Sequence, residues 1–191
     1  MLRGMIDKEY LKKEYIDEGK SVRRVAIELG CSENKVTYWL QKHKIKKRSI
    51  SEAIYQYKNP KGDPFKFCYP VSSETWFIYG LGLGLFWGEG NKANTSAVRL
   101  GNTDPAVVRC FIEFLEVLFS IDRQRLRFGL QVFSDVDPQE AQRFWERELR
   151  ADAHQFYKVT VTRTGKVGSY RKKSSHGVLT VYFSNKKLRD T

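Results

Sequence analysis

Apolar residues recur every three or four positions through residues 7–45, which is the spacing of one face of a helix. Capping and turn residues divide this stretch, because Asp7 can start a first helix, Gly19 can end it and Ser32 can start a third. The pattern therefore predicts three short helices packed on one another. Their buried faces are expected to consist of Val25, Ala26, Leu29, Val36, Trp39 and Leu40.

A tight turn at Gly30 is predicted between the second and third helices. This arrangement resembles the helix-turn-helix of resolvase-type and transposase-type DNA-binding domains, in which a small residue, here Ala26, lets the helices cross and a glycine forms the turn. The resemblance implies that the third helix enters the major groove of double-stranded DNA. A three-helix module that binds another protein is the alternative interpretation. The side chains expected to contact bases or phosphates are Asn34, Lys35, Thr37, Tyr38, Gln41 and Lys42.

After the third helix comes a basic run, followed by a segment with several helix breakers and one possible short helix, Ser51 to Lys58. The sequence therefore predicts a helix-turn-helix domain at residues 1–48, a linker at residues 49–72 and a second domain at residues 73–191. The linker region either follows a phosphate backbone or serves only as a tether. Its breakers are Pro60, Gly62, Pro64 and Pro70.

Residues 76–92, WFIYGLGLGLFWGEGNK, are largely apolar and free of proline, so they predict a helix in spite of their glycines. Each glycine costs about 1 kcal/mol of helix stability relative to alanine. Gly80, Gly84 and Gly88 are four residues apart and therefore lie on one face, as a ridge without side chains. Such a ridge either packs closely against the sheet of its own domain or lets a second helix approach.

The end of this helix resembles a known family. Residues 82–90, GLGLFWGEG, are similar to the LAGLIDADG motif of homing endonucleases, with Glu89 and Gly90 at its final acidic and glycine positions. In that family two such helices cross at a two-fold axis, and each brings one carboxylate to divalent metal above the scissile phosphates. Because the sequence holds one copy of the motif, the resemblance implies a homodimer, with an interface that includes Gly80, Gly84 and Gly88.

Alternating and helical patterns follow the motif, and together they predict an α+β domain. The resemblance covers roughly residues 75–190 and implies a LAGLIDADG-like, αββαββα-type fold. Its first β-ribbon is expected to be shortened, because only residues 91–103 separate the motif from the next helix. The predicted elements are a strand and a helix within residues 97–121, a strand at 125–133, a helix at 137–150, and strands at 155–163 and 177–185 around a basic loop.

The resemblance also implies a reaction, the metal-assisted hydrolysis of phosphodiester bonds in DNA. Mg²⁺ or Mn²⁺ would be held by the Glu89 carboxylate and the Gly88 carbonyl, since hard cations prefer oxygen ligands. A nearby lysine would stabilise the charge of the transition state, and Lys92 and Lys158 are the candidates. His176 either orients water or fills a turn.

Positive charge is concentrated at the two ends of the chain. The net charge of +12 is made up of +6 in residues 1–50, −2 in residues 51–149 and +8 in residues 150–191. Two basic regions are the distribution expected of a protein that meets a polyanion with two surfaces, and a basic surface that only aids solubility is the alternative. The second domain is expected to add DNA contacts through Arg99, Arg163, Arg171, Lys172 and Lys173.

Several classes of protein are excluded by the composition. The sequence has no run of eighteen apolar residues and no signal-peptide core, so we expect a cytoplasmic protein without a membrane partner, associated with the nucleoid when bound to DNA. Cys31, Cys68 and Cys110 lie far apart, which argues against a zinc site and a disulfide framework. We expect no small-molecule cofactor.

A non-cleaving transcription regulator that uses a LAGLIDADG-like scaffold for dimerisation and DNA binding is the second interpretation. Sporulation-type regulators of bacteria are similar, although their two domains occur in the opposite order and their metal-binding carboxylate is typically lost. Glu89 is retained in this sequence, which favours the enzyme. The shortened ribbon and the additional helix-turn-helix favour the regulator.

Overall fold

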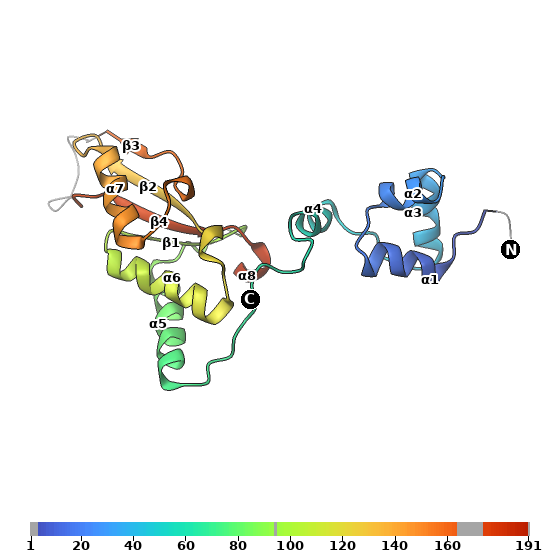
Figure 1. Ribbon diagram of the computed structural model, residues 1–191, viewed down its shortest axis with the longest axis horizontal. Helices are drawn as coiled ribbons and strands as arrows, with labels where there is room; N and C mark the ends of the chain where they lie inside the picture. Colours follow the sequence, from blue (N-terminus) through green and yellow to red (C-terminus); the bar gives the residue numbers. More distant parts are fainter. Residues whose placement is uncertain (1–3, 94, 164–173, 191) are drawn as a thin grey trace. The chain divides into compact units, whose positions relative to one another are not determined.

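The computed structural model describes residues 4–93, 95–163 and 174–190. The chain divides into two compact units, Met1–Asp63 and Pro64–Thr191 (Figure 1). Each unit has its own buried apolar core, so each folds around its own side chains.

All regular elements of the first unit are helices in its described residues. Its core lies between the first three helices, and Leu11, Val25 and Leu40 are completely buried there. Two residues that were expected to be buried in this core are not fully buried. Leu29 is exposed at the C-terminal cap of α2, and Trp39 is half-buried. The elements are α1 (Lys8–Leu11), which continues directly into the π-helical η1 (Lys12–Asp17), α2 (Val22–Glu28), α3 (Glu33–Lys42) and α4 (Ile50–Lys58).

Local capping explains where these helices begin and turn. The Asp7 carboxylate accepts a hydrogen bond from the Tyr10 backbone N–H at 2.9 Å, and the Ser32 hydroxyl accepts one from the Lys35 backbone N–H at 3.3 Å. Gly30 has φ +57°, the left-handed conformation that glycine adopts without a steric cost, and it forms the turn between α2 and α3. The predicted helix starts and the predicted turn are therefore confirmed.

The second unit combines helices with a four-stranded sheet (Figure 1). The strand order is β1-β4-β2-β3, with β4 antiparallel to β1 and β2, and β3 parallel to β2. This architecture confirms the predicted α+β class. The elements are α5 (Ser73–Glu89), β1 (Val98–Asn102), α6 (Pro105–Phe119), η2 (Arg123–Arg125), β2 (Arg127–Phe133), α7 (Pro138–Leu149), η3 (Ala153–Gln155), β3 (Thr160–Thr162), β4 (Val178–Phe183) and α8 (Lys186–Arg189).

The order of these elements differs from the αββαββα order that the resemblance implies. In the described residues, one strand instead of two lies between α5 and α6, and α7 lies between β2 and β3. The reason is the short connection after α5, since Gly90 already pairs with Leu100 and the Asn91 N–H donates to the Arg99 carbonyl at 3.0 Å. The described residues of this connection, 92, 93 and 95–97, form bends and no strand, so the expected ribbon is reduced there to a single bridge beside β1.

The expected linker, residues 49–72, is divided between the two units. α4 occupies its first part and belongs to the first unit, where Ser49 begins the helix with the reciprocal hydrogen bonds of a capping box. The last part belongs to the second unit, because the backbone N–H groups of Lys66 and Cys68 donate to the last two carbonyls of α6 at 2.9 and 2.7 Å. Hydrogen bonds to the two folded units therefore hold much of this segment.

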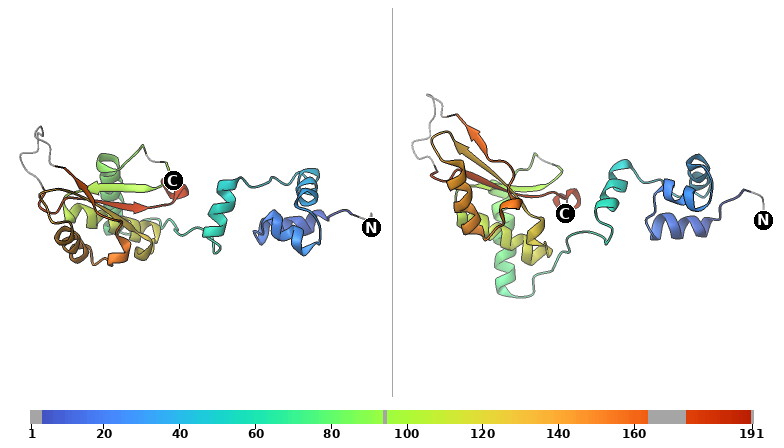
Figure 2. Two further views of the ribbon diagram at one scale, coloured as in Figure 1. Left: turned by 90° about the horizontal axis from the view of Figure 1, so that it is seen from above. Right: turned by 45° about the horizontal axis from the view of Figure 1, so that its top comes forward.

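Helices α6 and α7 cover one face of the sheet (Figure 1; Figure 2). Side chains on that face are buried, as in the row of cross-strand neighbours Leu100, Val181 and Phe128. The alternating positions of the strands belong to the opposite face and are exposed or half-buried. α5 packs against α6 and β1, next to this core.

Gly82 is the buried glycine of α5, because Phe114 of α6 packs directly on the α5 backbone at this point. A Cβ atom at Gly82 would overlap the Phe114 ring. We predict that Gly82→Ala lowers the free energy of unfolding of the second unit by about 1–3 kcal/mol through overpacking. The measurement is chemical denaturation at protein concentrations too low for self-association.

Gly84→Ala is the matched control, because a Cβ atom at Gly84 would meet nothing within 4 Å. Its methyl group should raise the stability of the monomer by up to about 1 kcal/mol through helix propensity alone. Equal effects of the two substitutions would show that Gly82 does not form the close contact between α5 and α6.

Candidate functional site

α3 presents a polar side to solvent while its other side lies in the core. Val36 and Leu40 are buried, and the Ser32 cap fixes where the helix starts. Amide, hydroxyl and ammonium groups on the polar side are of the types that pair with base edges and phosphates. All six residues predicted to contact DNA lie outside the core: Asn34, Tyr38, Gln41 and Lys42 are exposed, and Lys35 and Thr37 are half-buried.

Ion pairs engage carboxylates of η1 and α2 in the same unit. The Lys20 ammonium contacts the carboxylates of Glu14 and Glu28, and Arg24 Nε donates to Glu28 at 3.0 Å. The hydrogen bonds that Lys20 donates to Glu14 and Glu28 raise the pKa of Lys20, and the one that Glu28 accepts from Lys20 lowers the pKa of Glu28. Residues 34–48 hold six lysines and arginines and no acidic residue, so positive charge gathers on α3 and the segment that follows it.

α5 exposes a broad apolar surface with a stripe of glycines along it. Gly80, Gly84 and Gly88 are exposed, and a Cβ atom at any of them would meet nothing within 4 Å. Large apolar side chains border the stripe, and Trp87 is 78% exposed. Exposed apolar surfaces of this kind mark interaction sites. We call this surface the glycine face, and it consists of Trp76, Phe77, Gly80, Leu81, Leu83, Gly84, Trp87 and Gly88.

Glu89 is exposed and is the last residue of α5. Since successive helical residues are rotated by about 100°, Glu89 is turned about 100° away from Gly88, towards the side of the helix that carries Gly82. The Lys92 ammonium returns to the same end of the helix and donates a hydrogen bond to the Trp87 carbonyl. The Gly88 carbonyl belongs to the last turn, where carbonyls lack partners within the helix. Three of the predicted site residues, Glu89, Gly88 and Lys92, are thus brought together.

Arg189 joins this cluster from the end of the chain. Its Nη2 donates to the Lys92 carbonyl at 2.9 Å, and its guanidinium lies 5.7 Å from the centroid of the Phe86 ring. Two contacts hold α8 in place. Its Leu188 side chain is buried, and the Asn185 side-chain oxygen caps the helix by accepting the Leu188 N–H at 3.0 Å. Sequence reasoning missed Arg189. The Asn185 cap signals a helix there, but no local pattern indicates that this helix lies beside α5.

Lys158 is not near Glu89 within one chain. A row of paired residues crosses the sheet from Gly90 to Phe156 through β1, β4 and β2, and four strand spacings amount to about 19 Å. Lys158 and Arg163 flank β3 at one edge of the sheet, whereas Glu89 lies beside β1 at the other edge. Within one chain, Lys158 therefore lies far from Glu89, and its place in a site with Glu89 stays a prediction.

One chain does not complete a metal site in its described residues. No group of three histidine, cysteine, aspartate or glutamate side chains there is arranged to hold a metal ion. Glu89 and the Gly88 carbonyl match the oxygen-ligand preference of Mg²⁺ and Mn²⁺, but together they supply one negative charge. A second copy of α5 would supply the second carboxylate.

The face of the sheet opposite to α6 and α7 carries a row of basic and aromatic residues. Arg99 on β1, Tyr182 on β4 and Arg127 on β2 are cross-strand neighbours. The Arg99 guanidinium lies 4.9 Å from the centroid of the Tyr182 ring, and Tyr157 packs edge-on against that ring. Of this row only Arg99 was predicted as a DNA contact, because the alignment depends on the strand order. Of the other predicted contacts, Arg163 directly follows β3 and is exposed, whereas Arg171, Lys172 and Lys173 lie outside the described residues.

His176 has a packing role in the described residues. Its ring stacks on Phe144 with 3.6 Å between the ring centroids, and its backbone carbonyl accepts a hydrogen bond from Trp145 Nε1 at 2.8 Å. Gly177, the next residue, has φ +71°. Of the two interpretations of His176, these contacts support the one in which it fills a turn.

Comparison with known proteins adds no assignment. No protein-family model, curated protein or solved structure matches the chain significantly. In the part of the chain that is described, no helix has both the length and the apolar character needed to cross a membrane. The side chains of α3, of α5 and of the open sheet face are therefore the basis for assigning a function.

Proposed function

We propose that this chain is a sequence-specific protein that binds double-stranded DNA as a homodimer. The observation that carries DNA binding is the outward side of α3, where Asn34 and Gln41 are exposed within an acid-free basic segment, residues 34–48. Amide side chains pair with adenine in the major groove, and lysines neutralise phosphates. The same short helix therefore supplies both base-reading groups and sequence-independent affinity.

The glycine face supports the homodimer. In a monomer, Gly80, Gly84 and Gly88 would cost about 3 kcal/mol of helix stability relative to alanine, with no contact to offset it. A second copy of α5 crossing this face would bring the same residues together from both chains, as a two-fold interface requires. Close approach of the two backbones would also cover Trp76 and Trp87.

We propose further that the dimer is a LAGLIDADG-type endonuclease that hydrolyses phosphodiester bonds. Glu89 and the Gly88 carbonyl from each chain would hold Mg²⁺ or Mn²⁺ near the two-fold axis. The bound metal supplies Lewis-acid stabilisation of the phosphate charge. Lys92 donates a hydrogen bond to a carbonyl in the last turn of α5, and Arg189 donates one to the Lys92 carbonyl just after the helix. Their positive charges would favour a phosphate beside Glu89.

A transcription regulator that does not cut DNA is the second candidate, and one observation favours it. The ribbon after α5 is reduced to the bridge between Gly90 and Leu100, which leaves little surface for positioning a DNA strand over Glu89. Such a regulator would keep the glycine face for dimerisation and α3 for DNA binding. It would differ from the enzyme only in lacking metal-dependent cleavage.

Gln41 tests the role of α3. We predict that Gln41→Ala weakens binding to the preferred DNA site by about 1–3 kcal/mol and relaxes the base preference at one position, because an amide contact to a base is lost. The preferred site would be selected from random duplexes with the wild-type chain. Affinities would then be measured at one fixed salt concentration.

Gln139→Ala is the matched control, because Gln139 is exposed on α7 in the other unit. It should leave both affinity and base preference unchanged. A wild-type chain that selects no DNA sequence would refute the proposed DNA binding. A Gln41→Ala variant with the wild-type preference would instead show that this side chain does not read a base.

Glu89 tests cleavage. We predict that Glu89→Gln abolishes metal-dependent cutting of the selected site, because the substitution keeps the shape of the side chain but removes the charge that holds the metal. DNA affinity should stay nearly unchanged, which separates the chemistry from binding. The measurement is nicking of a plasmid that contains the selected site, with Mg²⁺ or Mn²⁺.

Glu74→Gln is the control for this experiment, since Glu74 is an exposed carboxylate in the first turn of the same helix. It should cut at the wild-type rate. Undiminished cutting by Glu89→Gln would exclude Glu89 as the essential ligand. Binding without cutting by the wild-type chain would favour the regulator.

A further inference from the structure

A non-helical basic segment connects α3 to α4, and it contributes three exposed lysines to the first unit. The segment consists of residues 44–48, Lys-Ile-Lys-Lys-Arg, and we call it the basic strap. Lys44, Lys46 and Lys47 are exposed. The strap starts two residues after Lys42, the last residue of the helix proposed to read DNA.

Both ends of the basic strap are fixed to the folded unit. At its start, the Ile45 N–H donates to the Leu40 carbonyl at 2.8 Å, and the Ile45 side chain packs against the first core. At its end, the Arg48 backbone N–H donates to the Tyr15 hydroxyl at 2.9 Å. Tyr15 is itself buried, so it provides a rigid attachment point.

The Arg48 side chain completes this attachment. Its guanidinium donates to the Gly19 carbonyl at 3.0 Å and to the Lys20 carbonyl, and it lies 4.2 Å from the centroid of the Tyr15 ring. The Arg48 side chain is therefore engaged by hydrogen bonds within the protein. The charge that the basic strap offers to a ligand comes from the three lysines.

The acidic groups around the lysines leave their charge largely uncompensated. In the described residues none of the three makes an ion pair. Glu52 on α4 is the one acidic group in the described part of the chain that interacts with Lys46 through space, and it forms no ion pair with it. Its carboxylate accepts the Ser49 backbone N–H at 2.6 Å, and this hydrogen bond lowers the pKa of Glu52.

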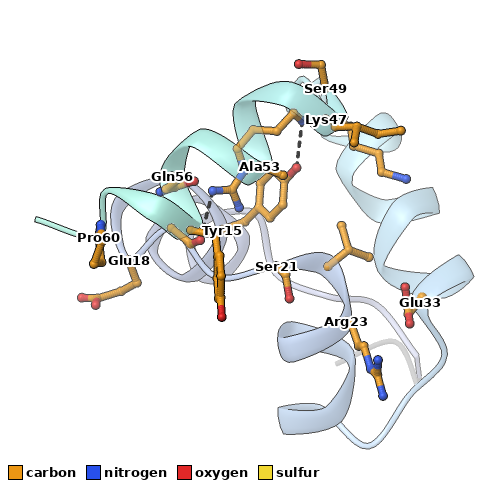
Figure 3. A pocket seen from close by; sticks show the side chains of 15 residues that line it. Tyr15, Glu18, Ser21, Arg23, Glu33, Lys47, Ser49, Ala53, Gln56 and Pro60 are labelled. Atoms are coloured by element: carbon orange, nitrogen blue, oxygen red, sulfur yellow. Dashed lines mark hydrogen bonds between the residues drawn. The ribbon is translucent and has the colours of Figure 1, made fainter. Parts of the chain in front are cut away.

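Lys47 lines a cleft of about 800 Å³ between α2, α3 and α4 (Figure 3). Glu18 and Glu33 line the same cleft, and Arg23 and Arg48 line it as well. The two carboxylates of this cleft are therefore outnumbered by the three positive charges of Arg23, Lys47 and Arg48. Lys44 and Lys46 remain as additional positive charge next to the end of α3.

We propose that the basic strap binds the phosphate backbone of the duplex beside the major-groove site of α3. Residues 44–47 span at most about 11 Å, a length over which duplex DNA presents about six phosphates, so each lysine has one within reach. Because both ends of the strap are already fixed, binding orders few additional groups. This inference rests on the proposed DNA binding and adds a second, sequence-independent contact to it.

The test compares two triple variants of the full chain. Lys44→Gln, Lys46→Gln and Lys47→Gln together remove the charges of the strap. Lys8→Gln, Lys58→Gln and Lys61→Gln together remove the same charge from exposed positions elsewhere in the same unit. Affinities for the selected site and for an unrelated duplex would be measured between 50 and 200 mM KCl, with the thermal unfolding midpoint of each variant as a check on folding.

A plot of log affinity against log salt concentration has a negative slope for a protein that binds DNA phosphates. We expect this slope to be shallower by about 2 to 3 in the strap variant, since each lost phosphate contact removes about 0.9 from its magnitude. The loss should be equal for the two duplexes, because phosphate contacts carry no sequence information. The control variant should keep the wild-type slope. All three proteins should unfold at the same temperature.

The possible failures are distinguishable. A wild-type chain that binds neither duplex overturns the proposed function and the strap together. A wild-type chain that binds DNA while the strap variant keeps its slope, or loses no more than the control variant, overturns the strap alone. A loss confined to the selected site would also overturn it, because that result indicates base contacts.

Discussion

The contact between Gly82 and the Phe114 ring determines which side of α5 faces the core of the second unit and which side faces solvent. Phe114 packs on the backbone of α5 where a side chain would otherwise stand, and this fixes which side of the helix faces α6. The glycines at positions 80, 84 and 88 are consequently turned away from the core. α5 is therefore a helix with glycine on two sides, one already in contact with its own unit and one still open.

The open side of α5 carries two energetic penalties that no contact within the described part of a single chain offsets. A stripe without side chains weakens a helix, and the apolar side chains beside it gain nothing in water. A second helix that crosses the stripe removes both penalties at once. In the proposed dimer the same crossing would bring the two ends of α5, and with them the two Glu89 carboxylates, towards one axis, where their mutual repulsion would favour a bound cation. The proposed dimer and the proposed metal chemistry thus depend on the same helix.

Local signals in the sequence were sufficient for the first unit. Asp7, Ser32 and Gly30 act on their immediate neighbours, so their roles could be predicted without knowledge of the fold. The second unit depends on strand order, which places Arg99 beside Tyr182 and separates Lys158 from Glu89. The sequence pattern also treats all four glycines of α5 alike, although Gly82 packs against Phe114 and the other three have no such contact. Long-range pairing, which has no local signature, accounts for these differences.

The central claim is that a second copy of this chain covers the glycine face, and the oligomeric state tests it most directly. Sedimentation equilibrium at micromolar concentration, with and without DNA, should show a dimer for the wild-type chain. Gly84→Leu should give a monomer with an unchanged fold, because the added side chain points into open space in one chain but blocks the approach of another. A monomeric wild-type chain under both conditions, or a Gly84→Leu variant that remains a dimer, would contradict the account.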